Sequence, residues 1–182
     1  RHVGENGVSA YGVLMYVQFI FIAIFIGYSI GSAPVIGYHY GAGNHSELQS
    51  MLKKSSLLMG GSGILLSFLA FSLADPLAGI FVGYDRELFA LTGHAFRLFS
   101  CSFCLAGFNI FISSFFTALS NGAVSAAISF LRTLVFQTAS VLILPVFFGV
   151  DGIWWAITVA EICACMISAA FLFSQRKKYR YL

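Results

Sequence analysis

The chain has 182 residues, of which 59% are hydrophobic and 9% are charged, with a formal net charge of +3. A water-soluble domain would be about a quarter charged, so this composition excludes a soluble globular protein. Nucleic-acid binding is also excluded as an interpretation of the basic residues, because four of the ten lie together in residues 176–180, directly after an apolar run.

Five long apolar runs dominate the sequence, at residues 10–36, 55–74, 96–119, 123–148 and 153–174. Each has the ~20 residues or more that a helix needs to cross ~30 Å of hydrocarbon. Because the runs are continuously apolar rather than alternating, they predict helices and not the strands of a membrane barrel. We therefore predict an all-α membrane protein with about five transmembrane helices, forming a bundle over residues 1–174 with a basic tail over residues 175–182.

The first run and the residues just after it contain several positions that interrupt a helix or allow close packing: Gly27, Gly31, Pro34, Gly37 and Gly41. The glycines form two G-x-x-x-G pairs, a spacing that lets helix backbones approach closely. The proline should kink or end the regular hydrogen bonding near Ile30. Two interpretations stay open, namely tight packing with a bend, and a hinge for conformational change. Gly41 or Gly43 is expected to cap the helix end.

The connections between the runs predict how the helices follow one another. Asp75-Pro76 should end the second helix. The mixed polar and apolar residues 84–97 are typical of a segment that lies along the membrane interface. Ser120-Asn121-Gly122 is a tight connector, so the third and fourth helices are expected to be antiparallel neighbours.

Basic residues are divided unequally between the two sets of alternating loops. One set, with the tail, holds Lys53, Lys54, Arg132, Arg176, Lys177, Lys178 and Arg180, and the other holds Arg1, Arg86 and Arg97. Cytoplasmic loops carry an excess of Lys and Arg, so we predict a multi-pass protein of the plasma membrane with a cytoplasmic C-terminus. The start of the chain then lies outside and has no initiator Met, which predicts at least one earlier helix in a longer protein.

Neither catalysis nor metal binding is predicted. Cys101 and Cys104, like Cys163 and Cys165, lie inside apolar runs, where packing thiols are a better interpretation than a redox or metal pair. The four scattered histidines form no convincing ligand set. Hydrolase, zinc-protease and cofactor motifs are missing from the sequence. We therefore expect a protein that is not an enzyme and carries no cofactor.

A few polar side chains within the runs are candidate substrate- or ion-binding residues. Glu161 is the only carboxylate well inside a run. A charge at mid-membrane costs roughly 2.5–3.5 kcal/mol, so Glu161 should be paired, protonated or facing a cavity. Arg132 should lie near the middle or in the inner half, and it can pair with Glu161 only if their depths match. Asn109, Gln18 and Gln137 can hydrogen-bond without a charge. For all five residues the alternative role is helix packing.

Three stretches, in this order, resemble the multidrug and toxic compound extrusion (MATE) transporters. The first comprises residues 31–44 and ends in Gly41-Ala42-Gly43-Asn44 before a basic helix. The second comprises residues 107–122, from Gly107-Phe108-Asn109 to the Asn121-Gly122 turn. The third runs from Leu131-Arg132-Thr133 through Leu144-Pro145 to Ala160-Glu161.

This resemblance implies twelve helices in two six-helix lobes, with this chain similar to the last five. The implied partners are the bilayer, a missing N-terminal lobe and amphipathic or cationic small molecules. The implied function is secondary active multidrug efflux by rocking alternating access, driven by Na⁺ or H⁺. In several branches of the family, carboxylates on the seventh and tenth helices bind the cation. Here the seventh helix is missing, and the span that resembles the tenth has no acid but carries Asn109, Ser113, Ser114 and Thr117.

Two alternative functions remain open at this point. A lipid-linked saccharide flippase of the same superfamily should have a more basic cavity, whereas only Arg132 is clearly a cation within the spans. A membrane scaffold without transport predicts that Glu161 and Asn109 can be replaced by Leu without functional loss.

Overall fold

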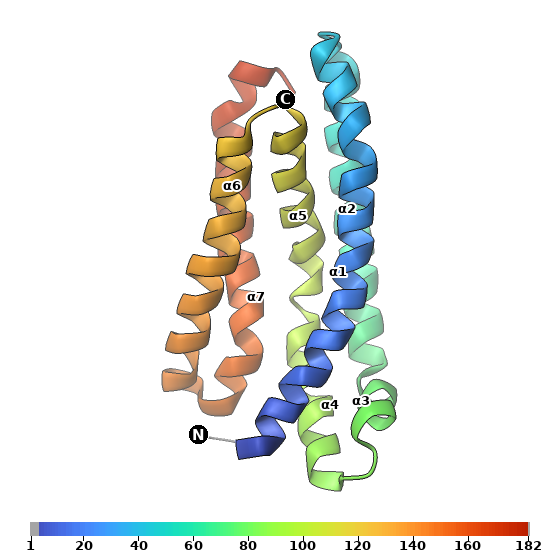
Figure 1. Ribbon diagram of the computed structural model, residues 1–182, viewed down its shortest axis with the longest axis vertical. Helices are drawn as coiled ribbons and strands as arrows, with labels where there is room; N and C mark the ends of the chain where they lie inside the picture. Colours follow the sequence, from blue (N-terminus) through green and yellow to red (C-terminus); the bar gives the residue numbers. More distant parts are fainter. Residues whose placement is uncertain (1–3, 182) are drawn as a thin grey trace.

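The computed structural model describes residues 4–181, so the predicted outside position of Arg1 and the last residue of the predicted tail lie outside the described residues. Within residues 4–181 the chain is helical and contains no strand. Its elements are α1 (Gly4–Gly41), α2 (His45–Ser72), α3 (Ala74–Val82), α4 (Arg86–Ser100), α5 (Phe103–Ala118), α6 (Gly122–Phe130), the π-helical η1 (Leu131–Phe136) and α7 (Gln137–Tyr179). The long helices run side by side and form an elongated bundle (Figure 1).

Five membrane spans follow from these helices, as the apolar runs predict. The stretches Gly4–Gly41, His45–Ser72 and Gly122–Tyr179 are long and apolar enough to cross a membrane, and α4 with α5 forms a further, bent span. The stretch Gly122–Tyr179 contains 58 residues and reverses at Gly149, so that its two arms lie antiparallel (Figure 1). Counted separately, these arms bring the number of spans in residues 4–181 to five.

The connection between α1 and α2 is short and closed by two local features. α1 ends at Gly41, and Gly43 follows with a φ of 68°, a left-handed conformation that glycine adopts without strain. The side chain of Asn44 then accepts a hydrogen bond from the backbone N–H of Glu47 at 3.3 Å and caps the start of α2. The helix end predicted at this glycine-rich segment is therefore observed.

The predicted helix at residues 96–119 is divided in two. α4 and α5 meet after Ser100 with a bend of 49°. α2 packs against this break, where Ser67 Oγ donates a hydrogen bond to the Ser100 carbonyl at 2.6 Å. A methyl group on Gly63 would lie 2.8 Å from two carbonyl oxygens of the first turn of α5. Small residues of α2 thus allow the close approach that stabilises the break.

The hairpin between the last two spans depends on two glycines. Gly149 has φ 58° and ψ −135°, which lies outside the helical region and reverses the chain. A methyl group on Gly152 would lie 2.5 Å from the Leu144 carbonyl oxygen. The two arms therefore begin in very close contact. α7 then continues to Tyr179, so residues 175–179 of the predicted tail extend the helix.

The glycines and the proline of α1 face different surroundings. α1 continues through Pro34 to Gly41, so the regular helix does not end near Ile30. A methyl group on Gly27 or Gly31 would meet no atom of another element within 4 Å. Within the described part of the chain, the first G-x-x-x-G pair therefore faces away from neighbouring helices. In the second pair, a methyl group on Gly37 would lie 3.4 Å from the Ala118 carbonyl oxygen, whereas one on Gly41 would meet nothing within 4 Å.

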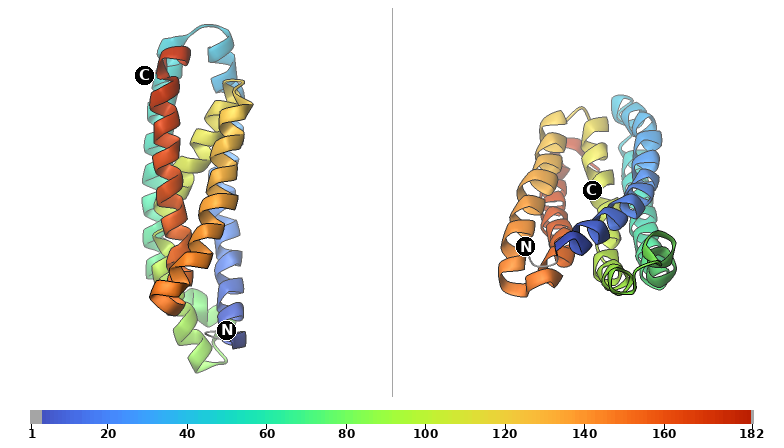
Figure 2. Two further views of the ribbon diagram at one scale, coloured as in Figure 1. Left: turned by 90° about the vertical axis from the view of Figure 1, so that its left-hand side faces the viewer. Right: turned by 60° about the horizontal axis from the view of Figure 1, so that its bottom comes forward.

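α5 lies between the α1–α2 pair and the α6–α7 hairpin (Figures 1 and 2). Its Phe111, Phe115 and Phe116 side chains are fully buried in the core. The outer faces of the bundle carry exposed apolar side chains such as Leu57 and Phe147, as expected for a surface in contact with lipid. This central position of α5 places Asn109 near the middle of the bundle.

Candidate functional site

Three polar side chains that the sequence singles out meet within the membrane-spanning region. Arg132 Nη2 and Nε donate hydrogen bonds to Glu161 Oε1 at 2.6 and 2.9 Å. Asn109 Nδ2 donates to Glu161 Oε2 at 2.8 Å and to the Glu161 carbonyl oxygen at 3.0 Å. The depths of Arg132 and Glu161 therefore match, and the pairing that the sequence left open is observed.

This cluster is largely removed from solvent. The side chains of Arg132 and Glu161 are 19% and 7% exposed, and Asn109 is fully buried. Buried charges persist only when they are paired and hydrogen-bonded, and here three charge-assisted bonds from Arg132, at 2.6 to 3.1 Å, and one from Asn109 compensate the carboxylate. Because the three residues belong to α5, η1 and α7, the cluster joins three spans.

Arg132 lies in an irregular part of its span. η1 comprises six residues with π-helical bonding, in which the Gln137 N–H reaches back to the Arg132 carbonyl. π-helical turns are rare and occur frequently at functional sites. No pattern in the sequence predicts this segment, and it changes the angular position of every residue that follows.

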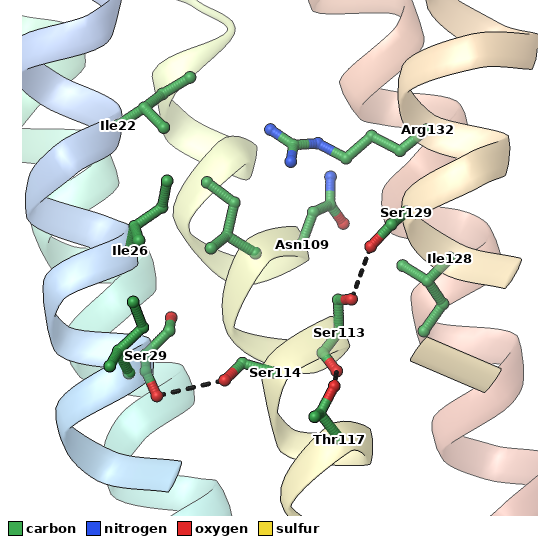
Figure 3. Close-up of a pocket in the computed structure, with 12 residues that line it drawn as sticks. Ile22, Ile26, Ser29, Asn109, Ser113, Ser114, Thr117, Ile128, Ser129 and Arg132 are labelled. Atoms are coloured by element: carbon green, nitrogen blue, oxygen red, sulfur yellow. Dashed lines mark hydrogen bonds between the residues drawn. The ribbon is translucent and has the colours of Figure 1, made fainter. Parts of the chain in front are cut away.

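A pocket of about 340 Å³ opens beside the cluster, between α1, α5 and the span that contains α6 and η1 (Figure 3). Its lining residues are mainly isoleucines and hydroxyl-bearing residues, and Arg132 is the one charged residue among them. They are Ile22, Ile26, Ser29, Ile30, Asn109, Ile110, Ser113, Ser114, Thr117, Ile128, Ser129 and Arg132. The pocket is therefore both polar and apolar, as a site for amphipathic molecules would be.

Hydroxyl groups on α5 connect this pocket to its neighbours. Ser113 and Ser129 share a hydrogen bond of 2.8 Å, and Ser114 Oγ donates to the Ser29 carbonyl at 3.2 Å (Figure 3). Two buried atoms facing this region, Ser29 Oγ and Asn109 Oδ1, have no hydrogen-bond partner among the described residues. Unsatisfied buried acceptors are unusual, and they give the pocket free capacity to bind a polar group.

The other two predicted site residues lie elsewhere. Gln18 is half-buried on α1, one helical turn before Ile22, and is not among the pocket's lining residues. Gln137 lines a separate shallow pocket of about 320 Å³ with Thr133 and Leu142. The structure thus brings together Asn109, Arg132 and Glu161, and leaves the two glutamines apart.

The sequence analysis missed two hydroxyl residues that line the pocket, Ser29 and Ser129, and Ser125, which lies beside it. Ser125 lies one turn from Ser129 and accepts a hydrogen bond of 2.7 Å from Thr117 Oγ1. The four-residue spacing of Ser125 and Ser129 would have placed both on one helix face, which was a signal available in the sequence.

An ionisable pair held inside the spans, next to a polar pocket, marks ion and substrate pathways in membrane proteins. Fold and site together define a multi-pass helical membrane protein with a buried ion pair beside a polar pocket. The sequence model of the MatE family matches residues 1–143 of the 182. The chain belongs to the MatE family, whose members are transporters and not enzymes.

Among proteins with curated names, the chain is similar to the multidrug export protein MepA from two Staphylococcus aureus strains, bovine RF122 / ET3-1 and MRSA252. Each is 22% identical over 165 residues, which cover 90% of this chain and 36% of the relative. The chain therefore spans about a third of the length of the curated relatives it matches.

Solved structures of the family share the fold over the whole described chain. The inward-facing conformation of a multidrug resistance MATE family transporter of the MOP superfamily has a TM-score of 0.92 at 19% identity, covering 98% of this chain and 42% of that one. The outward-facing conformation has a TM-score of 0.91 at 19% identity, covering 100% and 41%. The chain thus has the fold of less than half of a transporter.

Proposed function

We propose that the full-length protein is a secondary active multidrug exporter, with this chain forming most of its C-terminal lobe. The observation that carries this proposal is the buried Arg132–Glu161–Asn109 cluster beside a pocket within a MatE fold. The names of the curated relatives support drug export as the activity. The likeness to both inward-facing and outward-facing transporters supports alternating access by movement of the two lobes.

In this proposal Glu161 binds the coupling ion, which is Na⁺ or H⁺. A cation at the Glu161 carboxylate competes with the Arg132 guanidinium and with the Asn109 amide for the same oxygens. Ion binding therefore weakens the links of α7 to η1 and α5, and ion release restores them. The ion therefore binds with different affinities to the two arrangements of the spans. Any coupled transport cycle requires such a difference in affinity.

The transported compounds are amphipathic small molecules. Isoleucine side chains of α1 offer apolar contact, and the hydroxyl groups of α5 and α6 offer hydrogen bonds. While the ion pair is closed, the pocket has no free carboxylate among its lining residues. A cationic drug would then depend on the opening of the Arg132–Glu161 pair, which links drug affinity to the state of Glu161.

The protein is further proposed to lie in the plasma membrane with its C-terminus in the cytoplasm. Lys53 and Lys54 of α2 lie toward the same end of the bundle as the basic end of α7, consistent with the excess of Lys and Arg on cytoplasmic sides. The N-terminal lobe would complete the central cavity. A flippase for lipid-linked saccharides is not favoured, because the pocket's single cation is already paired with Glu161.

The test uses the full-length transporter and the substitution Glu161→Gln. Glutamine keeps the shape, but its single amide oxygen can accept from Arg132 or from Asn109 and not from both, and it cannot bind a cation through charge. We expect efflux of a fluorescent amphipathic dye, driven by an imposed Na⁺ or H⁺ gradient in proteoliposomes, to fall by about tenfold or more, within the range of coupling between linked sites.

Glu87→Gln is the matched control. Glu87 is exposed in the first turn of α4, at the start of the bent span and away from the residues that line the pocket, so gradient-driven efflux should be unchanged. Normal efflux by the Glu161→Gln transporter at normal expression would overturn the proposed role of the cluster and would support a packing role.

A further inference from the structure

Two adjoining apolar grooves lie on the outer surface of α2, at the end of the bundle that carries the C-terminus. The larger groove, of about 640 Å³, lies between α2 and the end of α7 and is lined by Leu52, Lys53, Leu57, Leu172 and Phe173, among others. The smaller groove, of about 390 Å³, is lined by Lys54, Leu57, Leu58, Gly61 and Ser62. Leu57 belongs to both grooves and separates them.

Each groove is lined by one lysine of α2, and in the larger groove Gln49 lies one helical turn beyond it. Lys53 and Lys54 are consecutive in α2 and exposed, and neither forms an ion pair among residues 4–181. Arg176 adds a third cation nearby, because its guanidinium lies 5.9 Å from the ring centre of Phe173 in the larger groove. The acid at this end of α2 is Glu47, two turns away from the lysines. Positive charge therefore dominates the head of both grooves.

The other side chains that line the two grooves are mostly apolar, which suits an apolar occupant. Leu57 and Leu58 are 78% and 51% exposed and project from α2. Gly61 lies one turn beyond Leu57, and a methyl group there would meet nothing within 4 Å, so the glycine leaves the smaller groove open. In a membrane protein these surfaces face acyl chains rather than water.

The end of the chain forms part of the larger groove. Tyr181 is buried, and its hydroxyl donates to the Leu172 carbonyl at 3.0 Å. Gln49 Nε2 donates to the Arg180 carbonyl at 3.2 Å and ties the chain end to α2. Burial, with a smaller contribution from Tyr179, raises the pKa of Tyr181. The phenol therefore stays neutral and adds no charge to the groove.

We propose that this surface is a binding site for one anionic phospholipid, with its phosphate between Lys53 and Lys54 and its two acyl chains in the two grooves on either side of Leu57. Basic pockets between membrane helices at headgroup depth bind anionic lipid headgroups. The two grooves have room for two acyl chains, which a soluble anion does not have. This site is remote from Glu161 and does not depend on the proposed drug export.

The experiment uses the purified full-length protein in detergent. Native mass spectrometry measures lipid binding, and thermal unfolding is the second readout. Phosphatidylglycerol and phosphatidylcholine with identical acyl chains are the two probes. We expect phosphatidylglycerol to bind more tightly and to raise the unfolding temperature, because a ligand that binds only the folded state stabilises it. Equal binding of the two lipids would overturn the proposal.

The double substitution Lys53→Gln/Lys54→Gln should weaken phosphatidylglycerol binding by about 30-fold, from the contribution of two lysines at a membrane surface. Lys177→Gln/Lys178→Gln removes the same charge from the end of α7, outside both grooves, and should leave binding nearly unchanged. If both double variants lost phosphatidylglycerol binding equally, the lipid would be attracted to the basic end of the bundle as a whole. That result would overturn the proposed site.

Gly61→Leu tests the acyl-chain grooves without changing charge. Leucine fills the open space and is a better helix former than glycine, so the protein should fold at least as well. We expect phosphatidylglycerol to bind more weakly even though both lysines are still present. Unaltered lipid binding by Gly61→Leu, or cross-linking of a second copy of the chain through the groove, would contradict a lipid occupant.

Discussion

At the scale of single residues, the Arg132–Glu161 pair determines both stability and the proposed coupling. Removing one partner of a buried pair leaves the other charge unpaired and costs about 3–5 kcal/mol, whereas replacing both by apolar residues is often close to neutral. We therefore expect Arg132→Leu to destabilise the full-length protein strongly. Arg132→Leu/Glu161→Leu should recover most of that loss.

Denaturant unfolding in detergent, arranged as a double-mutant cycle, measures this coupling directly. The single Glu161→Leu variant completes the cycle. If the double variant lost as much free energy of unfolding as the two single variants together, the 2.6 Å ion pair would contribute little to the stability of the folded state.

The residues of this cluster could be identified as candidates from the sequence. The sequence could not predict that their side chains lie in contact. Glu161, Arg132 and Asn109 are conspicuous because polar groups inside apolar runs need partners. Gln18 and Gln137 satisfy the same criterion and lie apart from the cluster. What separates the two groups is the rotation and depth of each span, and the π-helical η1 and the reversal at Gly149 change both. Local sequence patterns do not encode those angles.

At the scale of elements, the break between α4 and α5 depends on α2. Ser67 Oγ satisfies the Ser100 carbonyl, which the bend leaves without its usual helical partner. Ser67→Ala should destabilise the protein by about 1–3 kcal/mol, the cost of an unsatisfied buried acceptor. Ser62→Ala is the matched control, since Ser62 Oγ bonds only to the Met59 carbonyl of its own helix. Thermal unfolding of both variants is the measurement, and equal small effects would show that the bend does not need Ser67.

The hairpin between the last two spans provides a second comparison. Gly152→Ala would bring a methyl group to 2.5 Å from the Leu144 carbonyl oxygen, and overpacking of this kind costs about 1–3 kcal/mol. Gly122→Ala, at the start of α6, meets no atom within 4 Å and should be neutral. Reduced unfolding temperature in the first variant alone is the expected result. An equally stable Gly152→Ala protein would mean that the hairpin arms can separate freely.

Run length and apolar content were sufficient to predict the five spans and the all-helical class. They could not predict the division of residues 96–119 into α4 and α5, because the apolar character continues across the bend. The bend is caused by close packing of Gly63 and Ser67 on α2, about 35 residues earlier in the chain. Tertiary contacts of this kind override a local pattern that favours one continuous helix.

At the scale of the whole molecule, the alternation of spans predicts which connections share a side of the membrane. Tyr84, between α3 and α4, is 84% exposed, and Ser120, between α5 and α6, is exposed at the opposite end of the bundle. With the four free cysteines replaced, Tyr84→Cys should react with an impermeant maleimide on intact cells. Ser120→Cys should react only after permeabilisation. The reverse pattern would place the C-terminus outside.

The charge compensation between Arg132 and Glu161 also has a consequence for biosynthesis. Each residue alone would oppose entry of its segment into lipid by roughly 2.5–3.5 kcal/mol. The sharp turn at Gly149 lets the second segment fold back on the first as soon as both have emerged from the ribosome. The two segments are therefore suited to partition into the bilayer as a pre-paired unit, and a nascent polypeptide truncated before Glu161 would leave an uncompensated guanidinium at the translocon.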